Sequence, residues 1–355
     1  MIRQAVILSN KAEYGENYHQ VKFVDKEKAK RYTLLRSNLL DSLQTKTTVC
    51  SRDTKIYSGE LSPGCRMCVE GRWSCLFINN KCNAACFYCP STQDDLSLPS
   101  TDNFIFNNPD DYVAYLHEFG FKGASFSGGE PLLSFDRTVE YLRAVRQHFG
   151  SDMHIWLYTN GILLTPERAA ILASEGLDEI RFDISANRYS IEKIKFAAGK
   201  IPVITVEIPA VPEDLALLKE KSSDMVSEGV NHLNLHQLRL TPYNFHKLTG
   251  RDYTFLHGTK VTVLDSEMAA LEMIRYTTEK GVDLPVNYCS FVYKNRYQAL
   301  AARNRYAPLM QSQWEHMSSS GYLRSVFLPG DMKDASSTLL ARYGDKLLSS
   351  GSNIH

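Results

Sequence analysis

Short apolar runs alternate with helical patterns from Trp73 onward, and this alternation limits the fold more than any other feature of the chain. It is typical of a parallel sheet whose strands are joined by crossover helices. The predicted strands are Trp73–Asn79, Gly123–Ser127, His154–Tyr158, Glu179–Ile184, Val203–Ile208 and His232–Leu235. The helices predicted between them are Pro109–Phe119, Asp136–Phe149, Pro166–Ser174, Ile191–Ala198 and Glu213–Glu228. In parallel barrels the loops after the strands carry the chemistry, so functional residues are expected there.

The segments on either side of this alternation are expected to form extensions. The predicted division is an N-terminal extension with a Cys-rich metal loop at 1–72, a βα domain at 73–290 with an insertion at about 241–264, and a C-terminal extension at 291–355. Further elements predicted from the apolar spacing are helices at Lys26–Leu43, Asp265–Lys280 and Lys294–Tyr306, and a strand at Val282–Tyr288.

Six of the eight cysteines lie between Cys65 and Cys89, and the last three have the spacing C-x3-C-x2-C directly after the first predicted strand. Three thiolates on a short loop, here Cys82, Cys86 and Cys89, can hold three irons of a [4Fe–4S] cluster and leave the fourth iron open. Disulfides are not the default in a chain of intracellular character. Structural zinc is the other alternative, but it requires four closed ligands and this triplet supplies three.

Composition limits the partners of the chain. Its 355 residues are 43% hydrophobic and 23% charged, which is ordinary for a globular protein. The formal net charge is zero, so no global field favours nucleic acid or an anionic membrane, and a nucleic-acid partner is not expected. No apolar run approaches the length of a membrane span, and the N-terminus lacks signal-peptide architecture. A cytoplasmic protein without a membrane partner is expected.

The cysteine triplet, the aromatic residue Tyr88 before its third cysteine and the strand that precedes it resemble the radical S-adenosylmethionine (radical SAM) superfamily. The resemblance implies a partial (β/α)6 barrel of TIM type. It also implies an oxygen-sensitive enzyme whose open iron binds the amino and carboxylate groups of SAM, with Tyr88 near the adenine. A flavodoxin or ferredoxin is the reductant that such a family implies.

A second motif, Ser127-Gly128-Gly129-Glu130-Pro131, follows the second predicted strand. Two glycines let the backbone approach a ligand closely, and a carboxylate can bind a ligand ammonium group. Alone, Gly-Gly-Glu would also fit an ordinary strand-to-helix turn. One strand after the cysteine triplet, it resembles the radical SAM segment that meets the methionine end of SAM.

Polar side chains at the ends of the later predicted strands are further candidates for binding SAM or substrate. They are Thr159, Asn160, Asp183, Ser185, Glu207 and His236. Simpler interpretations remain open for four of them: a plain turn at Thr159-Asn160-Gly161, a helix-capping role for Asp183, and a satisfied core histidine at His236.

The remaining cysteines predict a second metal site. Cys65-x2-Cys68 and Cys75 precede the cluster loop, and Pro63-Gly64 and Gly71 offer the tight turns of a metal knuckle. The predicted ligands are Cys50, Cys65, Cys68 and Cys75, with Cys289 either a leftover thiol or a replacement for Cys50. A second iron–sulfur cluster, a rubredoxin-like iron and zinc all fit such a set. Inert buried thiols are the alternative.

Two patterns, SPGC-x2-C-x2-G from Ser62 and YCS-x2-YK-x-RYQ from Tyr288, resemble one branch of the superfamily. It contains proteins related to pyruvate formate-lyase activating enzyme, including the methanogenesis-marker enzyme that methylates an arginine of methyl-coenzyme M reductase. The tail after Gln298 shows no evident cobalamin motif, so cobalamin is not expected.

The resulting hypothesis is an enzyme that reductively cleaves SAM to methionine and a 5′-deoxyadenosyl radical. The radical would abstract hydrogen from a substrate, expected to be a peptide or protein side chain, as in post-translational modification. The alternatives are a glycyl-radical-enzyme activase, and a non-catalytic zinc or iron metalloprotein that acts as an assembly factor.

Overall fold

The computed structural model describes residues 2–102, 104–325, 328–329, 349–350 and 353–354. They divide into a compact unit of residues 1–298 and a second unit of residues 299–355. All predicted site residues belong to the first unit. In the described part of the second unit, helix α11 (Ala299–Met310) precedes a short hairpin of β14 (His316–Met317) and β15 (Leu323–Arg324), followed by the short strands β16 (Leu328–Pro329), β17 (Ser349–Ser350) and β18 (Asn353–Ile354).

A parallel sheet forms the centre of the first unit. Its strands, in spatial order, are β3 (Trp73–Asn79), β6 (Gly123–Gly128), β7 (His154–Thr159), β8 (Glu179–Phe182), β9 (Val203–Pro209), β10 (His232–His236) and β13 (Val286–Cys289). The six predicted strands are therefore confirmed, and β13 is the shorter form of the strand expected at Val282–Tyr288. The α/β class with a large parallel sheet is also confirmed.

Short strands extend both edges of this sheet. At one edge, β2 (Lys55–Ser58) pairs antiparallel with β13, and β1 (Thr47–Cys50) pairs antiparallel with β2. At the other edge, β4 (Ser100–Thr101) and β5 (Phe104–Ile105) follow β3. The N-terminal segment thus contributes to the sheet, and the expected division at residues 72 and 290 stays a prediction.

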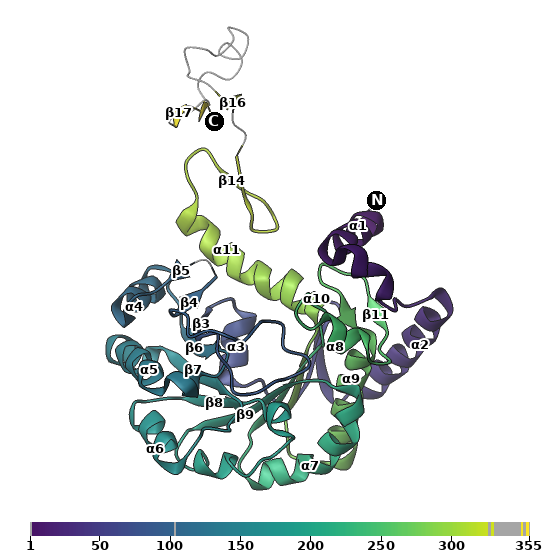
Figure 1. Cartoon of the computed structure of the whole chain (residues 1–355), viewed down its shortest axis with the longest axis horizontal. Helices are drawn as coiled ribbons and strands as arrows, with labels where there is room; N and C mark the ends of the chain where they lie inside the picture. The colour runs from purple at the N-terminus through teal and green to yellow at the C-terminus, as the bar shows by residue number, and fades with distance from the viewer. Residues whose placement is uncertain (1, 103, 326–327, 330–348, 351–352, 355) are drawn as a thin grey trace. The chain divides into compact units, whose positions relative to one another are not determined.

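Helices cover the outer face of the sheet, as Figure 1 shows. They are α4 (Pro109–Glu118), α5 (Phe135–Phe149), α6 (Pro166–Ser174), α7 (Leu215–Ser227) and α9 (Leu264–Lys280). The sequence marks their starts: Thr165 accepts a hydrogen bond from Arg168 N (3.2 Å), and Pro166 opens the first turn of α6. None of the described helices is long and apolar enough to cross a membrane.

One predicted helix is wrong. The segment Ile191–Ala198 contains only the 3₁₀ turn η5 (Ile194–Phe196). Arg188 and Tyr189 just before it adopt left-handed backbone angles (φ 50° and 58°), and Gly199 just after it does so as well (φ 72°). Too few residues remain between these turns to repay the cost of nucleating an α-helix.

The N-terminal extension also contains α1 (Ile2–Tyr14) and α2 (Lys26–Leu43), the second of which has its predicted bounds. The aromatic insertion forms α8 (Phe245–Thr249), β11 (Phe255–Leu256) and β12 (Thr262–Val263). Tyr14 of α1 shares a buried core with these elements, and Phe87 and Tyr88 of the cysteine loop pack against it. The insertion therefore supports the loop that carries the cysteine triplet.

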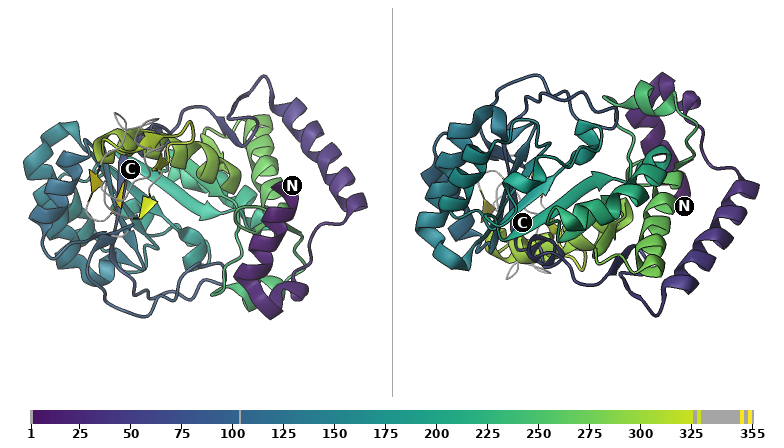
Figure 2. Two further views of the ribbon diagram at one scale, coloured as in Figure 1. Left: turned by 90° about the horizontal axis from the view of Figure 1, so that it is seen from above. Right: turned by 90° about the horizontal axis from the view of Figure 1, so that it is seen from below.

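The segment expected to form a metal knuckle is instead the helix α3 (Pro63–Val69). Ser62 caps it by accepting a hydrogen bond from Cys65 N (3.2 Å), and Pro63 opens its first turn. In Figure 1 the strands curve around α3, on the side of the sheet away from the outer helices, and the views of Figure 2 show the same curvature of the strands. Cys65 and Cys68, three residues apart on a helix, share one face of α3.

Candidate active site

A cavity of about 350 Å³ lies where the parallel strands end. The loop after β3 contributes Cys86, Tyr88 and Cys89, and the end of β6 contributes Gly128 and Gly129. The other residues that line it are Pro90, Gln93, Asp183, Pro209, His236, Gln237, Leu238, Arg239, Phe291 and Lys294. The cavity thus brings together two motifs that lie about forty residues apart in the sequence. The ends of four later segments complete its lining.

Gly128 and Gly129 allow the end of β6 to pack against the cysteine loop. A Cβ atom at Gly128 would lie 2.1 Å from Asn79 O, and one at Gly129 would lie 2.0 Å from Lys81 O. Gly129 N donates to Asn79 O (2.8 Å), and Glu130 N donates to Lys81 O (2.8 Å). Any larger residue would push the two segments apart, so the glycines both line the cavity and fix the loop.

Glu130 joins the ends of β6 and β7 and does not line the cavity. Its carboxylate is buried and accepts hydrogen bonds from Leu132 N (3.0 Å), Thr159 Oγ1 (2.8 Å) and Asn160 N (2.7 Å). Burial raises the pKa of Glu130 to about 7, and these hydrogen bonds oppose a larger rise. Glu130 thus contacts the residues at the end of β7, and we expect it to position them.

Asn160 connects the end of β7 to the cysteine loop. Its Nδ2 donates to Asn83 Oδ1 (2.7 Å) and, more weakly, to Cys82 Sγ (3.8 Å), while its Oδ1 accepts from Ile162 N (3.0 Å). Thr159 Oγ1 accepts from Gly161 N (3.0 Å). Thr159 and Asn160 thus form a turn, as the simpler interpretation held, and Asn160 also braces the loop.

Tyr88, Asp183 and Ser185 form one polar group at the cavity wall. The hydroxyl of Tyr88 donates to the Asp183 carboxylate (3.0 and 3.1 Å) and lies 2.6 Å from Ser185 Oγ. Burial raises the pKa of Asp183, and hydrogen bonds from Ser185 and Tyr88 oppose that rise. Asp183 also accepts from Ala186 N (3.2 Å), so its predicted capping role and its place in the cavity coexist.

Comparisons with known proteins show the family of this chain. The family model described as "Radical SAM superfamily" matches residues 76–194. A Methanocaldococcus jannaschii protein with the provisional name glycyl-radical enzyme activating enzyme is 30% identical over 260 residues, covering 69% of this chain and 67% of that protein. This chain belongs to the radical SAM superfamily. It is therefore a radical SAM enzyme, as the cysteine spacing predicted.

Other similar proteins match this chain over a smaller share of their own length. A GTP 3′,8-cyclase of Synechococcus is 34% identical over 119 residues, which is 31% of this chain and 33% of the cyclase. Streptococcus suis SuiB, solved with its precursor peptide SuiA, aligns with 62% of this chain and 48% of its own, at 14% identity and a TM-score of 0.45. The chain thus spans about half of SuiB and a third of the cyclase.

The radical SAM family implies a [4Fe–4S] cluster and SAM, and the cysteine loop offers suitable donors. Within the described residues, no three His, Cys, Asp or Glu side chains lie close enough to enclose a metal ion. The fit rests on donor chemistry: Cys82, Cys86 and Cys89 are free, partly exposed thiols on one loop, and two of them face the cavity. Burial raises the pKa of the Cys86 thiol to about 12.

His236 on β10 and Glu207 on β9, both predicted to bind SAM or substrate, have different surroundings. His236 lines the cavity, and its buried Nδ1 has no hydrogen-bond partner in the described part of the chain. Burial, followed by nearby Lys294, lowers the pKa of His236 to about 3, so its imidazole is neutral. Glu207 does not line the cavity, because its carboxylate accepts from Arg181 (2.6 Å) and Asn234 (3.0 Å).

The sequence interpretation missed three cavity residues that follow β10 and β13. Arg239 and Lys294 both stack over the Phe291 ring, 5.4 and 5.6 Å from its centroid. Among the described residues neither cation has an ion-pair partner. Phe291 and Lys294 lie within the pattern YCS-x2-YK, and Arg239, Phe291 and Lys294 all follow strand ends, which was the available signal.

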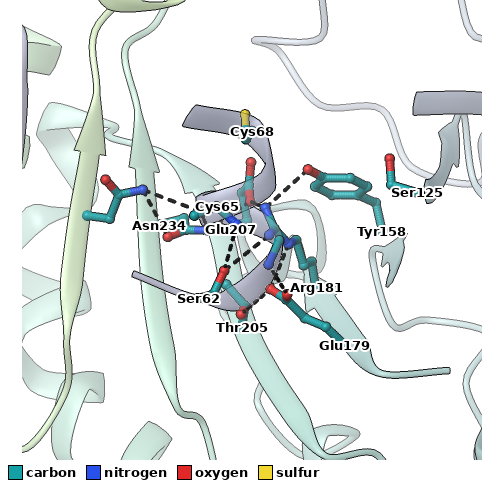
Figure 3. A network of polar contacts seen from close by, with 12 residues as sticks. Ser62, Cys65, Cys68, Ser125, Tyr158, Glu179, Arg181, Thr205, Glu207 and Asn234 are labelled. Carbon is teal, nitrogen blue, oxygen red and sulfur yellow. Dashed lines mark hydrogen bonds and ion pairs between the residues drawn. The ribbon is translucent and has the colours of Figure 1, made fainter. Parts of the chain in front are cut away.

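A buried polar network holds α3 against the strands (Figure 3). Arg181 pairs with Glu179 (2.8 Å) and Glu207 (2.6 Å) and donates to Ser62 Oγ (3.1 Å). Gly64 N donates to Glu179 (3.1 Å), and a Cβ at Gly64 would lie 2.3 Å from the Arg181 guanidinium. Arg181 lies between the two carboxylates, and His154 Nε2 lies 3.0 Å from Glu179, so each buried charged group has the partner that buried ions require. The network fixes α3 and its two cysteines.

Three cysteines outside the loop accept hydrogen bonds from nitrogen donors. Cys65 Sγ accepts from Asn234 Nδ2 (3.1 Å), and Cys289 Sγ accepts from Lys55 Nζ (3.1 Å). Asn287 Nδ2 donates to both sulfurs at 3.6 Å. Cys68 Sγ accepts from Gln298 Nε2 at 2.7 Å.

Cys50 belongs to the same region by register. Cys50 is directly opposite Lys55 across the β1–β2 pair, and Lys55 is directly opposite Cys289 across the β2–β13 pair. Residues that are opposite each other in a ladder project from the same face, so Cys50, Lys55 and Cys289 form one row.

Cys75 lies elsewhere. It is opposite Ser125 across the β3–β6 pair, and its thiol hydrogen-bonds to Ser125 and Ser127. Burial raises the pKa of Cys75 to about 11. Ser127, predicted to meet SAM, thus contacts this thiol and does not line the cavity. Cys50, Cys65, Cys68 and Cys289 lie in one region around Tyr293, although no three of these described thiols are close enough to enclose a metal ion, and Cys75 lies apart from them. All eight cysteines lie in the described residues, and none forms a disulfide.

Proposed function

We propose that this chain binds a [4Fe–4S] cluster through Cys82, Cys86 and Cys89, binds SAM in the adjoining cavity, and abstracts hydrogen from a peptide or protein substrate. The observation that carries the proposal is the cavity itself, which Cys86, Cys89, Gly128 and Gly129 line together. When bound, the cluster and SAM supply a reductive cleavage that yields methionine and a 5′-deoxyadenosyl radical.

The protein's own residues place these groups and control the cavity around them. Gly128 and Gly129 keep the strand end in contact with the cysteine loop, which aligns the SAM side of the cavity with the thiols. Tyr88 and Asp183 hold a fixed hydrogen-bonded wall where SAM would lie. The neutral imidazole of His236 offers a nitrogen without a partner to SAM or to substrate.

Two observations support a peptide or protein as the substrate. The Methanocaldococcus jannaschii relative carries the name of an activating enzyme for glycyl-radical enzymes, which are proteins. The GTP 3′,8-cyclases among the relatives match 31% to 46% of the chain, less than the 69% that the activating-enzyme relative matches. A glycyl-radical activase is the second candidate within this proposal, because it too abstracts hydrogen from a protein.

The test is SAM cleavage by the full chain. Protein reconstituted with iron and sulfide without oxygen, then given dithionite and SAM, should form 5′-deoxyadenosine. A Cys82→Ala/Cys86→Ala/Cys89→Ala variant should form none, while Cys75→Ala should retain the activity. Equal product from the wild type and the triple variant would refute the proposal.

We also propose that Cys50, Cys65, Cys68 and Cys289 bind a second metal, as iron, zinc or a cluster. The support is the charge of Lys55, whose side chain is 2% exposed. A buried ammonium needs a counter-charge, yet among the described residues Lys55 pairs with no carboxylate and contacts Asn287 Oδ1 (2.6 Å) and Cys289 Sγ (3.1 Å). An anionic metal–thiolate group would supply that charge.

The hydrogen bonds to the sulfurs support the same proposal. Asn234, Asn287, Lys55 and Gln298 all present N–H groups to Cys65, Cys68 or Cys289. Outer contacts of this kind orient ligands and stabilise their deprotonated form. Cys75 has hydroxyl partners, and no cation of the described residues influences its thiol, so we assign it no metal.

A further inference from the structure

A second cavity, of about 650 Å³, adjoins the candidate active site. Residues from α1 and α2, the β1–β2 turn, the β11–β12 segment, α9 and the segment after β13 line it. It shares Gln237 and Phe291 with the active-site cavity, so the two spaces meet at those side chains. We call this second space the side groove.

Positive charge is concentrated in the side groove although the chain as a whole is neutral. Its lining contains the cations Arg36, Arg52, Lys260 and Arg296 and one carboxylate, Glu267. Arg36 is bonded to Glu267 (2.8 Å), and Lys260 to Glu13 (3.1 Å).

Two of these cations are free to bind a partner. Arg52 and Arg296 are exposed, and the described residues contain no ion-pair partner for either. Arg52 is the middle residue of a turn in which Ser51, Arg52 and Asp53 all have left-handed backbone angles (φ 55°, 55° and 60°). Non-glycine residues adopt this conformation at a cost, and such costs cluster at binding sites.

The cations continue to the junction of the two spaces. There Phe291 lies beneath Arg239 and Lys294, which also lack ion-pair partners among the described residues. The side groove also has apolar lining from Val6, Leu256 and Val292. A lining that combines cationic and apolar side chains fits a peptide with acidic and apolar side chains.

We infer that the side groove docks an acidic peptide segment of the substrate and leads its target residue past Phe291 into the active-site cavity. This inference rests on the proposed function, because it assigns a substrate to that same cavity. Electrostatic complementarity of this kind sets specificity and the rate of association. Nucleic acid is the competing anion, but the apolar lining favours a peptide.

The experiment uses the reconstituted full chain and a fluorescein-labelled polyglutamate peptide, with a polyglutamine peptide of equal length as the neutral probe. Fluorescence anisotropy should show binding of polyglutamate that weakens with added salt, and no binding of polyglutamine. An Arg52→Glu/Arg296→Glu variant should bind at least about tenfold more weakly. The control variant Lys122→Glu/Lys195→Glu reverses two exposed charges outside both cavities and should bind like the wild type.

Three results would overturn the inference: no binding of polyglutamate by the wild type, equal loss in both variants, or tighter binding of a single-stranded RNA than of the peptide. Thermal unfolding of each variant shows that it is folded before it is compared. SAM cleavage by the wild type without peptide is measured in parallel. Absence of cleavage alongside peptide binding would refute the proposed function alone, whereas cleavage without peptide binding would refute the docking inference alone.

Discussion

The two groups of cysteines in this enzyme are built in different ways. Cys82, Cys86 and Cys89 lie within eight residues of one loop, partly exposed at the edge of a cavity. Cys50, Cys65, Cys68 and Cys289 come from β1, α3 and β13, and nitrogen donors and a buried lysine surround them. The first group is defined by local spacing, and the second by strand register and by the docking of a helix.

Under the proposed function, the two groups would have different roles. A partly open loop can leave one iron free for a small ligand, which the chemistry of SAM requires. A group fixed by a network of buried ion pairs suits a closed site that stabilises the fold or conducts an electron. The predictions below test whether the two groups are separate.

The largest effect is expected from removal of a ligand in the second group. Cys289→Ala should lose the additional metal completely, because a site with one ligand missing cannot remain closed. Cys75→Ala is the matched control and should keep all of its metal. Elemental analysis of iron and zinc per chain measures both. Loss of metal from the Cys75→Ala variant alone would show that the ligand set expected from sequence was right.

Removal of the Glu130 carboxylate should have the next largest effect. Glu130→Ala leaves three donors unpaired, which at about 1 kcal/mol each lowers the free energy of unfolding by about 3 kcal/mol. SAM affinity should fall with it, and Glu130→Gln should recover part of both because its amide oxygen still accepts.

Glu140→Ala, on the exposed face of α5, is the control and should change neither quantity. Chemical denaturation and SAM titration provide the two readouts. A variant at Glu130 with wild-type stability and weakened SAM binding would mean that the carboxylate contacts SAM directly and is not a positioning group.

Replacement of Lys55 should have an intermediate effect. Lys55→Met removes the buried counter-charge while keeping the length of the side chain, and the affinity for the second metal should fall by roughly 10–100-fold. Lys55→Arg retains the charge and should lose less. Competition with a chelator measures the affinity. Unchanged affinity in Lys55→Met would show that the thiols do not carry the charge that Lys55 balances.

The smallest effect is expected at Tyr88. Tyr88→Phe removes the hydrogen bonds to Asp183 and Ser185 but keeps the aromatic ring, at a cost of about 1 kcal/mol in stability. The yield of 5′-deoxyadenosine should remain within about tenfold of the wild type. Complete loss of cleavage would place the hydroxyl among the catalytic groups.

The sequence predicted those features of the structure that depend only on residues close together in the chain. A few neighbouring residues were enough to predict four features: the strand Trp73–Asn79, the start of α6 at Thr165-Pro166, the cysteine triplet and the Gly-Gly pair. Even there, the sequence assigned Glu130 to SAM, while the structure engages its carboxylate with the end of β7. Such a partner depends on which strands are adjacent.

The second cysteine group could not be resolved from sequence for the same reason. The spacing C-x2-C suggested a knuckle, but Pro63 and Ser62 favour a helix start, and the helical spacing places both thiols on one face. The choice between Cys75 and Cys289 depends on the pairing of β2 with β13, which joins residues more than two hundred positions apart. Glu207 likewise meets Arg181 only through the order of the strands.

The most direct test of the central claim, that the loop alone carries the SAM-binding cluster, is the electron paramagnetic resonance spectrum of the reduced protein with and without SAM. We predict a [4Fe–4S]+ signal that SAM shifts, that persists in Cys289→Ala and that is absent from the Cys82→Ala/Cys86→Ala/Cys89→Ala variant. A signal that SAM leaves unchanged, or one that survives in the triple variant and still responds to SAM, would contradict the account.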